Sequence, residues 1–291
     1  MTSQPATGIE PGFQHFVLTR YFVRFSDAPQ DAVTGSPEQR AWLAERLVLF
    51  RRYCLPSVTA QTVQDFTWLV YFDRNTPADA LEQVRELVRS HPNIHVMLCD
   101  RFDDEVRRRD IAALLRPGVG WLLTTRLDND DGWRADFVQR LQSEVRPGRR
   151  EFLNFPTGIL LYDDMTFLYR HDSNAFISLS EPADDFVTVI CAPHTDLSAH
   201  GTIRQLPPQP AFIQVIHPGT RSNKPRGVRV HRLLALAGFE ALFGENTDAD
   251  AETDWRIVGF NATRALAWAA RDRLIALGRG LAMQFRSRRP A

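Results

Sequence analysis

The stretch FTWLVYFD, residues 66–73, decides the fold class of this 291-residue chain. Its apolar side chains follow one another with almost no polar residue between them, and it ends on Asp73. A strand that is apolar on both faces is typical of a parallel sheet covered by helices on both sides. The stretch therefore predicts a buried parallel strand with a carboxylate at its carboxyl end.

Strand and helix patterns alternate on either side of this stretch. Short apolar runs occur at residues 13–20, 93–100 and 120–128, and helical spacing of apolar residues occurs at residues 36–54, 76–90 and 110–117. Such alternation is the signature of an α/β sheet with parallel strands. Ligands of such sheets bind beyond the carboxyl ends of the strands. Asp73 and Asp128 are expected at such ends, while for Asp100 we prefer a turn-forming role.

The ends of the helices follow from local signals. Ser36 is the expected cap of the first helix, Gln39 completes a capping box, and Pro56 is expected to end this helix. Thr76 is the expected cap of the second helix, because a helical pattern of apolar residues follows it directly.

The pattern changes after residue 150. Strands are predicted within residues 152–172, with a hairpin near Asp163, and at residues 186–194 and 210–219. This half is expected to be mixed and antiparallel and to continue the same sheet. No Gly- or Ser-rich linker divides the chain, so we expect one domain at residues 13–235 and a C-terminal helical extension at residues 236–291.

Composition and charge narrow the class of protein. The formal net charge is +0, whereas a general nucleic-acid binder carries a basic excess. The cysteines Cys54, Cys99 and Cys191 are far apart, which argues against a disulfide framework and favours a reducing compartment. The sequence has no secretory signal pattern and no apolar stretch of membrane-spanning length, so we expect a cytoplasmic protein.

An acidic cluster, LDNDDG at residues 127–132, follows the run at residues 120–128. Its three carboxylates belong to Asp128, Asp130 and Asp131, and like charges this close need compensation. An EF-hand spacing fails, because the twelfth position is Gln139 where a glutamate is required. Neither a P-loop nor a G-x-G-x-x-G motif occurs at the expected place.

The D-x-D pair of Asp128 and Asp130 suits a hard divalent cation. Two alternate carboxylates in a turn can present oxygens to Mg²⁺ or Mn²⁺, which then bridges them to the phosphates of a bound nucleotide. The alternative is an Asx-turn that caps the following helix. Both interpretations place the cluster at the carboxyl end of a buried strand.

Four segments together resemble the bacterial rhamnosyltransferase family, whose members are glycosyltransferases with the GT-A fold. They are HFVLTRYFVRF, YCLPSVTAQTVQDFTWLVYFD, LTTRLDNDDGW and FIQVIHPGTRSN, and the resemblance covers residues 13–229. It implies an α/β, GT-A-like (Rossmann-like) mixed sheet flanked by helices, in a single domain with a C-terminal helical tail. It also implies transfer of a sugar, with rhamnose as one candidate, from a nucleotide-diphosphate sugar to a glycan or other hydroxyl acceptor.

The resemblance assigns roles to residues that match the family's pattern. Asp128 and Asp130 match its metal-binding D-x-D, and a late histidine completes the metal shell in this fold. His217 fits that position, and His194 is its competitor. The ends of the first two strands contact the nucleotide sugar, and the residues there are Thr19, Arg20 and Asp73.

The chemistry calls for further groups. Arg126 adds cationic support for the leaving diphosphate, with Arg221 and Lys224 as additional candidates. An inverting enzyme also needs a general base near the acceptor oxygen. Glu181 is the favoured candidate, and its competitors are Asp185, Asp196 and His194.

Two other functions stay open. A nucleotidyltransferase would share the α/β frame, although the loop after the first strand lacks the Gly-rich, basic character of that class. A non-catalytic metal- or carbohydrate-binding module would release no nucleoside diphosphate. The arginine-rich segment at residues 256–289 predicts either a basic amphipathic helix on an anionic membrane surface or a terminal helix packed on the domain.

Overall fold

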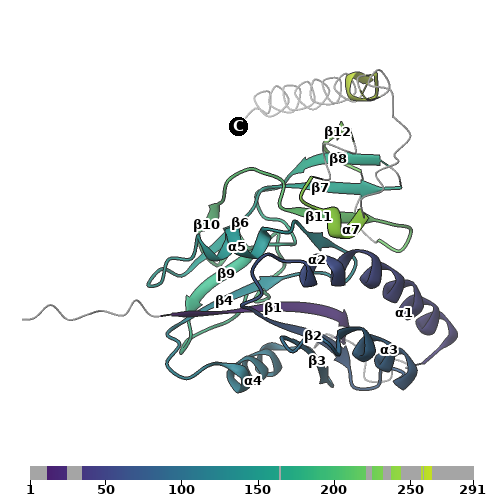
Figure 1. Ribbon diagram of the computed structural model, residues 1–291. Helices are drawn as coiled ribbons and strands as arrows, with labels where there is room; N and C mark the ends of the chain where they lie inside the picture. Colours follow the sequence, from purple (N-terminus) through teal and green to yellow (C-terminus); the bar gives the residue numbers. More distant parts are fainter. Residues whose placement is uncertain are drawn as a thin grey trace, which may run out of the picture.

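Two β-sheets and the helices around them make up the described part of the chain. The computed structural model describes residues 12–24, 35–163, 165–220, 225–231, 237–243, 257 and 259–263. The larger sheet has the strand order β10-β6-β9-β4-β1-β2-β3, and the smaller sheet has the order β12-β8-β7-β11-β5. In Figure 1 the smaller sheet lies above the larger one, and helices α1 (Pro37–Leu49) and α2 (Leu55–Thr59) run beside the boundary between them.

The larger sheet is mixed, as the sequence predicts. Its strands are β1 (Phe13–Phe22), β2 (Thr67–Asp73), β3 (Ile94–Cys99), β4 (Trp121–Arg126), β6 (Glu151–Asn154), β9 (Ser178–Pro182) and β10 (Ile203–Gln205). Strands β1 to β4 are mutually parallel where they pair, and β9 runs antiparallel to both β4 and β6. Almost every residue of β2 is buried, which explains the unbroken apolar run at residues 66–73.

Helices cover both faces of this sheet. The flanking helices are α1 (Pro37–Leu49), α3 (Ala78–Val88) and α4 (Asp104–Leu114), and the shorter α5 (Phe137–Gln142) and the 3₁₀ turn η2 (Leu197–Ala199) follow later. Val17 and Val70 pack in one cluster with Leu43 of α1. Their neighbours along the strands pack in a second cluster with Ile111 of α4. Because side chains alternate along a strand, α1 and α4 lie on opposite faces.

The smaller sheet contains strands from both halves of the chain and is separate from the larger sheet. The expectation that the second half continues the same sheet is therefore wrong for the strands of this sheet that follow residue 150. Its strands are β5 (Gly132–Trp133), β7 (Thr157–Tyr162), β8 (Met165–Arg170), β11 (Phe212–Ile216) and β12 (Val228–Val230). The antiparallel pairing of β7 with β8 confirms the hairpin near Asp163. Helix α7 (Glu240–Phe243) brings Leu242 into a buried cluster with Tyr53 and Ile213. Residues 237–243, assigned to the C-terminal extension by sequence, therefore pack against this sheet.

Pro56 does not end the first helical segment. After α1 the chain continues as a π-helical turn, η1 (Phe50–Cys54), and then as α2 (Leu55–Thr59). A proline inside an α-helix clashes with the carbonyl one turn earlier, and a π-helical turn widens the helix at that point. The predicted stop was wrong because this local widening lets the chain pass Pro56 while staying helical.

The caps follow the prediction in part. The backbone N–H of Gln39 donates to Ser36 Oγ at 3.2 Å, which confirms Ser36 as the cap of α1. The side chain of Gln39 bonds the N–H of Gly35 rather than that of Ser36, so the reciprocal half of the capping box is shifted by one residue. Thr76 does not cap α3. Its hydroxyl donates to the carbonyl oxygen of Asp73 at 2.6 Å and closes the turn after β2.

Two other boundaries differ from the predictions. Residues 186–194 form turns rather than a strand within the described chain, and the strand lies earlier, at β9. Helix α4 begins at Asp104, well before residue 110, because Asp103 accepts the N–H of Val106 and caps an extra turn and a half.

The parallel strands end at a common edge of the larger sheet. Leu18 pairs with Arg126 of β4, Thr19 pairs with Val70 of β2, and the N–H of Leu127 donates to the carbonyl of Leu18. The carboxyl ends of β1, β2 and β4 therefore lie on one side, as expected. The acidic cluster follows β4 at this edge.

Candidate active site

Asp128 lies between two arginines. Arg126 Nη2 is 2.9 Å from its Oδ2, and Arg20 Nη2 is 3.7 Å from its Oδ1. Burial by itself raises the pKa of the Asp128 carboxyl, but the guanidinium groups of Arg126 and Arg20 outweigh it and lower the pKa to about 2. Asp128 is therefore ionised throughout the physiological range.

The negative charge of Asp130 is offset by other residues than that of Asp128. Its Oδ2 lies 2.5 Å from Arg46 Nη1 and 3.0 Å from His217 Nε2. The Arg46 guanidinium also stacks over the ring of Trp42, with 4.9 Å to the ring centroid. The other ring nitrogen of His217, Nδ1, lies 3.6 Å from Glu45 Oε1. Helix α1 thus supplies an aromatic, an acidic and a basic side chain to this half of the cluster.

Asp131 has a structural role. It is 4% exposed, and its Oδ1 accepts the N–H of Val215 at 2.9 Å, which ties the cluster to β11. Burial, followed by the neighbouring charges of Asp130 and Asp128, raises the pKa of this carboxyl well above its ordinary value. The three carboxylates therefore differ in environment, although the sequence presents them as one run.

The contacts of Asn129 and the cap of the next helix argue against an Asx-turn that caps that helix. Asn129 Nδ2 donates to the carbonyl oxygen of Tyr21 at 3.1 Å, which locks the D-x-D turn onto the end of β1. The cap of α5 is Asp136, whose side chain makes no capping hydrogen bond. The cluster therefore does not cap the following helix.

One cavity beside the cluster, the Trp42 pocket, has a volume of about 590 Å³. Its lining includes Trp42, Arg46, Asp128, Asp130, Gln214 and Thr220. It lies on the α1 side of the sheet edge and combines an aromatic ring with carboxylate, guanidinium and amide groups.

A second cavity, the arginine pocket, has a volume of about 1080 Å³. Its lining includes Arg20, Phe102, Arg107, Arg126, Cys191 and His194. Burial, followed by the charge of Arg126, lowers the pKa of Arg20, and the charge of Arg107 acts in the same direction. An anion bound here would offset this effect on Arg20. Asp103, Asp104 and Glu105 also line the cavity, where Arg107 pairs with Asp104. Because Arg20 also lines the Trp42 pocket, the two cavities meet beside Asp128.

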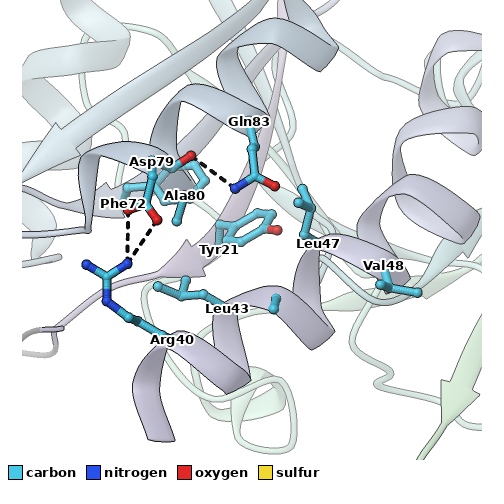
Figure 2. Close-up of a pocket in the computed structure, with 10 residues that line it drawn as sticks. Tyr21, Arg40, Leu43, Leu47, Val48, Phe72, Asp79, Ala80 and Gln83 are labelled. Atoms are coloured by element: carbon cyan, nitrogen blue, oxygen red, sulfur yellow. Dashed lines mark hydrogen bonds and ion pairs between the residues drawn. The ribbon is translucent and has the colours of Figure 1, made fainter. Parts of the chain in front are cut away.

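A third cavity, of about 320 Å³, lies between α1 and α3 and is mostly apolar. Figure 2 shows Tyr21 among Leu43, Leu47 and Phe72, with the Arg40–Asp79 ion pair at one side. The Tyr21 hydroxyl is buried and has no hydrogen-bond partner among the described residues. This cavity contains none of the acidic-cluster side chains.

Two residues that were predicted to contact the nucleotide bind other groups of the protein instead. Thr19 is fully buried, and its Oγ1 accepts the indole N–H of Trp68 at 2.8 Å, so it belongs to the core and cannot reach a ligand. Asp73 lies at the predicted edge but is 1% exposed. It pairs with Arg24 and accepts the N–H of Asn75 at 2.7 Å. Arg20 and Arg126 line the arginine pocket, and their contact with a nucleotide sugar stays a prediction.

Glu181 is misplaced for a general base. It is fully buried in β9, opposite Leu122, near the amino end of β4 and so away from the edge that carries Asp128. Its oxygens accept the N–H groups of Val187 and Thr188. Burial raises the pKa of Glu181 while these bonds lower it, so the group is a structural acceptor. The short strand shows no clear alternation of apolar and polar residues, so the sequence does not reveal that Glu181 is buried in a sheet.

The competitors of Glu181 lie in different surroundings. Asp185 is exposed and lies 3.1 Å from Arg150 Nη2, and Asp196 is exposed beside Thr195. His194 lines the arginine pocket, and its Nδ1 lies 2.7 Å from the carbonyl oxygen of Ser173. Burial lowers the pKa of His194, which favours the neutral imidazole.

Between the two histidines, the geometry favours His217 as the one beside the D-x-D pair. Its Nε2 contacts Asp130 directly, as noted above, while the N–H of Gly219 donates to its Nδ1 at 3.2 Å. His194 lies on the side of Asp128. The remaining candidates Arg221 and Lys224 lie outside the described residues.

The donor set near the cluster suits a divalent cation that the substrate helps to bind. Within the described ranges, no group of three or more His, Cys, Asp or Glu side chains converges as a complete metal site. Asp130 and His217 converge as a pair. Mg²⁺ commonly binds to one or two carboxylates plus substrate phosphates, so an incomplete protein shell is compatible with such an ion.

Four contributors to the site were missed in sequence: Trp42, Glu45, Arg46 and Arg107. Trp42 and Arg46 are four residues apart on α1, a spacing that signals a shared helix face but does not say what that face meets. Arg107 is one of several arginines in DDEVRRRD, and it is 3% exposed. No local signal distinguishes it from its solvated neighbours.

Comparisons with known proteins bear on the family. A model of the family described as "Putative rhamnosyl transferase" matches residues 38–229, more than half of the chain. No curated protein matches the sequence significantly. Within the described residues, no helix combines the length and apolar character that crossing a bilayer requires.

Solved structures give distant matches. S. aureus TarS 1–349 is 12% identical with a TM-score of 0.39, and the match covers 69% of this chain and 60% of that chain. The same fragment in complex with UDP-GlcNAc is 11% identical with a TM-score of 0.39, covering 71% and 60%. A "putative nucleotide-diphospho-sugar transferase" from Desulfovibrio desulfuricans is 11% identical with a TM-score of 0.35, covering 86% and 95%. The chain thus spans 60% of the length of the TarS fragment. The family match over residues 38–229 shows that the chain belongs to the putative rhamnosyl transferase family, a family of glycosyltransferases.

Proposed function

We propose that the protein transfers a sugar from a nucleotide-diphosphate sugar to a hydroxyl group of a glycan or other acceptor. The observation that carries this proposal is the position of the Asp128-x-Asp130 pair. It lies at the carboxyl edge of the parallel strands, between an arginine-lined cavity and an aromatic one. Such an edge is where open α/β sheets bind their ligands.

The arginine pocket suits the donor. Arg20, Arg107 and Arg126 line it, and a diphosphate would bring negative charge beside these guanidinium groups. Arginine binds phosphate oxygens in bidentate fashion, which also orients the leaving group. These side chains would stabilise the charge that grows on the diphosphate as the glycosidic bond breaks.

A divalent cation, Mg²⁺ or Mn²⁺, would be held by Asp130 and His217, with Asp128 beside them. When bound, such an ion supplies Lewis-acid stabilisation of the departing diphosphate. For His217 to bind through Nε2, its proton must reside on Nδ1. In this geometry Nδ1 accepts the N–H of Gly219, so a proton on Nδ1 would displace that bond, and Glu45 Oε1, 3.6 Å away, would be the carboxylate beside it.

The Trp42 pocket suits the acceptor. An indole face beside carboxylate and amide groups offers both stacking and hydrogen bonding to a sugar ring. The pocket meets the donor side at Arg20, so an acceptor hydroxyl there would approach the transferred sugar beside the D-x-D pair.

The test is a panel of sugar nucleotides, including a rhamnose donor, scored for release of nucleoside diphosphate with Mn²⁺ and with chelator. Release with one donor supports the proposal and identifies the sugar. Formation of a sugar nucleotide from a nucleoside triphosphate and a sugar phosphate would indicate a nucleotidyltransferase instead. Glycan binding without diphosphate release would indicate a binding module.

The place of action follows from the same proposal. Nucleotide sugars are made in the cytoplasm, which is where we expect the protein to act. Of the basic segment at residues 256–289 the structure describes only residues 257 and 259–263, so contact of this segment with an anionic membrane surface stays a prediction.

A further inference from the structure

Arg46 and His217 meet on one oxygen of Asp130. Arg46 comes from α1 and His217 follows β11, and they lie 84 and 87 residues from Asp130 in sequence. The side chains of Arg46 and Asp130 are each 13% exposed, and that of His217 is 9% exposed. A carboxylate with so little solvent depends on its partners for compensation, because an unpaired charge there is costly.

The Arg46 guanidinium has other contacts that do not involve Asp130. It stacks over Trp42, and its Nη1 is 3.3 Å from Asn129 Oδ1. These contacts would hold the guanidinium in the Trp42 pocket if its bond to Asp130 were broken. The Arg46 guanidinium therefore has other stacking and hydrogen-bonding partners within the same site.

We propose that Arg46 and the divalent cation compete for the Asp130 carboxylate, so that Arg46 sets the affinity of the site for metal. This inference rests on the proposed function, since it concerns regulation of the same site. A cation on either oxygen of Asp130 comes within a few ångström of the guanidinium, and two cations at that separation repel strongly in a partly buried site. The phosphates of the donor offset this repulsion by adding ligands for the metal and negative charge beside Arg46. Metal and donor then bind together, and a cation alone binds weakly.

Calorimetric titration of Mn²⁺ into the full-length protein, without donor, tests the competition directly. Arg46→Gln removes the competing charge, Arg46→Lys retains it, and Asp130→Asn removes the contested carboxylate. Arg40→Gln is the matched control, because Arg40 is on the same helix and pairs with Asp79 at the surface. Thermal unfolding of each variant checks that the fold is intact.

Arg46→Gln should bind Mn²⁺ on the order of ten-fold more tightly than the wild type. In the wild type the metal must displace the bond between Arg46 and Asp130, and a hydrogen bond to a charged, partly buried group contributes about a factor of ten in binding. Arg46→Lys should return the affinity toward the wild-type value, Arg40→Gln should match the wild type, and Asp130→Asn should abolish binding. If Arg46→Gln binds Mn²⁺ as weakly as the wild type or more weakly, the proposal is overturned. It is also overturned if neither the wild type nor Arg46→Gln binds Mn²⁺ up to its highest soluble concentration.

A second assay separates this failure from failure of the proposed function. Diphosphate release from a sugar nucleotide is measured with Mn²⁺ and with chelator. If Arg46→Gln binds metal no more tightly but the wild type still releases diphosphate, glycosyl transfer stands and the competition is wrong. If no donor is cleaved under any condition, the proposed function fails whatever the metal affinity.

Discussion

Glu181 accepts the backbone N–H of Thr188 at 2.8 Å, and Thr188 has a positive φ of 70°. A β-branched residue rarely adopts a positive φ, because its side chain then crowds the backbone. Thr188 Oγ1 in turn accepts from Arg107 Nε at 3.3 Å, and Arg107 lines the arginine pocket. The carboxylate that the sequence suggested as a base thus holds the loop beside one arginine of the arginine pocket.

Glu181→Gln should destabilise the protein and leave turnover little changed. The amide has one oxygen, so it cannot accept both N–H bonds, and one buried donor is left unpaired at a cost of about 1–3 kcal/mol. Urea unfolding measures this loss, and the exposed Asp185→Asn serves as the control. A fall in kcat on the order of 10²–10⁴-fold with unchanged stability would restore Glu181 as the base.

Asp130→Asn should abolish most diphosphate release while the melting temperature stays close to that of the wild type. An amide is a neutral and poorer ligand for a divalent cation, and the contact with Arg46 loses its ionic part. The wild type should lose activity in chelator and regain it with Mn²⁺. Full activity of the wild type in chelator would show that no divalent cation is required.

Arg126→Gln should raise the KM for the donor by roughly ten-fold, because a charge-assisted bond to the diphosphate is lost. The matched control is Arg74→Gln, since Arg74 also lies near the edge of the sheet but pairs with the exposed Asp100. Steady-state kinetics with the best donor from the panel measures both. An unchanged KM in Arg126→Gln would remove this side chain from the donor site.

His15 makes stability depend on pH. It is buried beside Thr125, and burial lowers the pKa of His15 from 6.5 to about 3. The folded state therefore favours the neutral ring, and the stability this provides is present above pH 6.5 and is lost as pH falls toward 3. Between pH 7 and pH 5 the loss is about 2 kcal/mol. His15→Gln should show a smaller drop in urea-unfolding free energy over that interval, and an identical drop would contradict the assignment.

Gly158→Ala should destabilise the smaller sheet. A Cβ at Gly158 would overlap the ring of Phe212, which is fully buried and stacked on Phe176 at 4.1 Å between centroids. With no room for the ring to move, overpacking of this kind costs about 1–3 kcal/mol. Gly12→Ala is the control, since a Cβ there meets nothing within 4 Å. Equal stability of the two variants would show that the core can relax around position 158.

The sequence by itself determined the α/β class and the edge at which the site lies. Both depend on local pattern: an unbroken apolar run such as residues 66–73 suits a strand buried on two faces, and β2 is such a strand. Parallel strands bring their carboxyl ends to one edge whatever their order. Asp73 and the cluster after β4 could therefore be placed together before any contact was known.

Only the tertiary structure decided which of these side chains line a cavity. Thr19 and Asp73 are at the predicted edge, yet one is bonded in the core to Trp68 and the other is paired with Arg24. Arg46 meets Asp130 across 84 residues of sequence. Such pairings depend on helix α1 packing over the sheet, because the free energy of a side chain's charge is set by neighbours that local sequence does not contain.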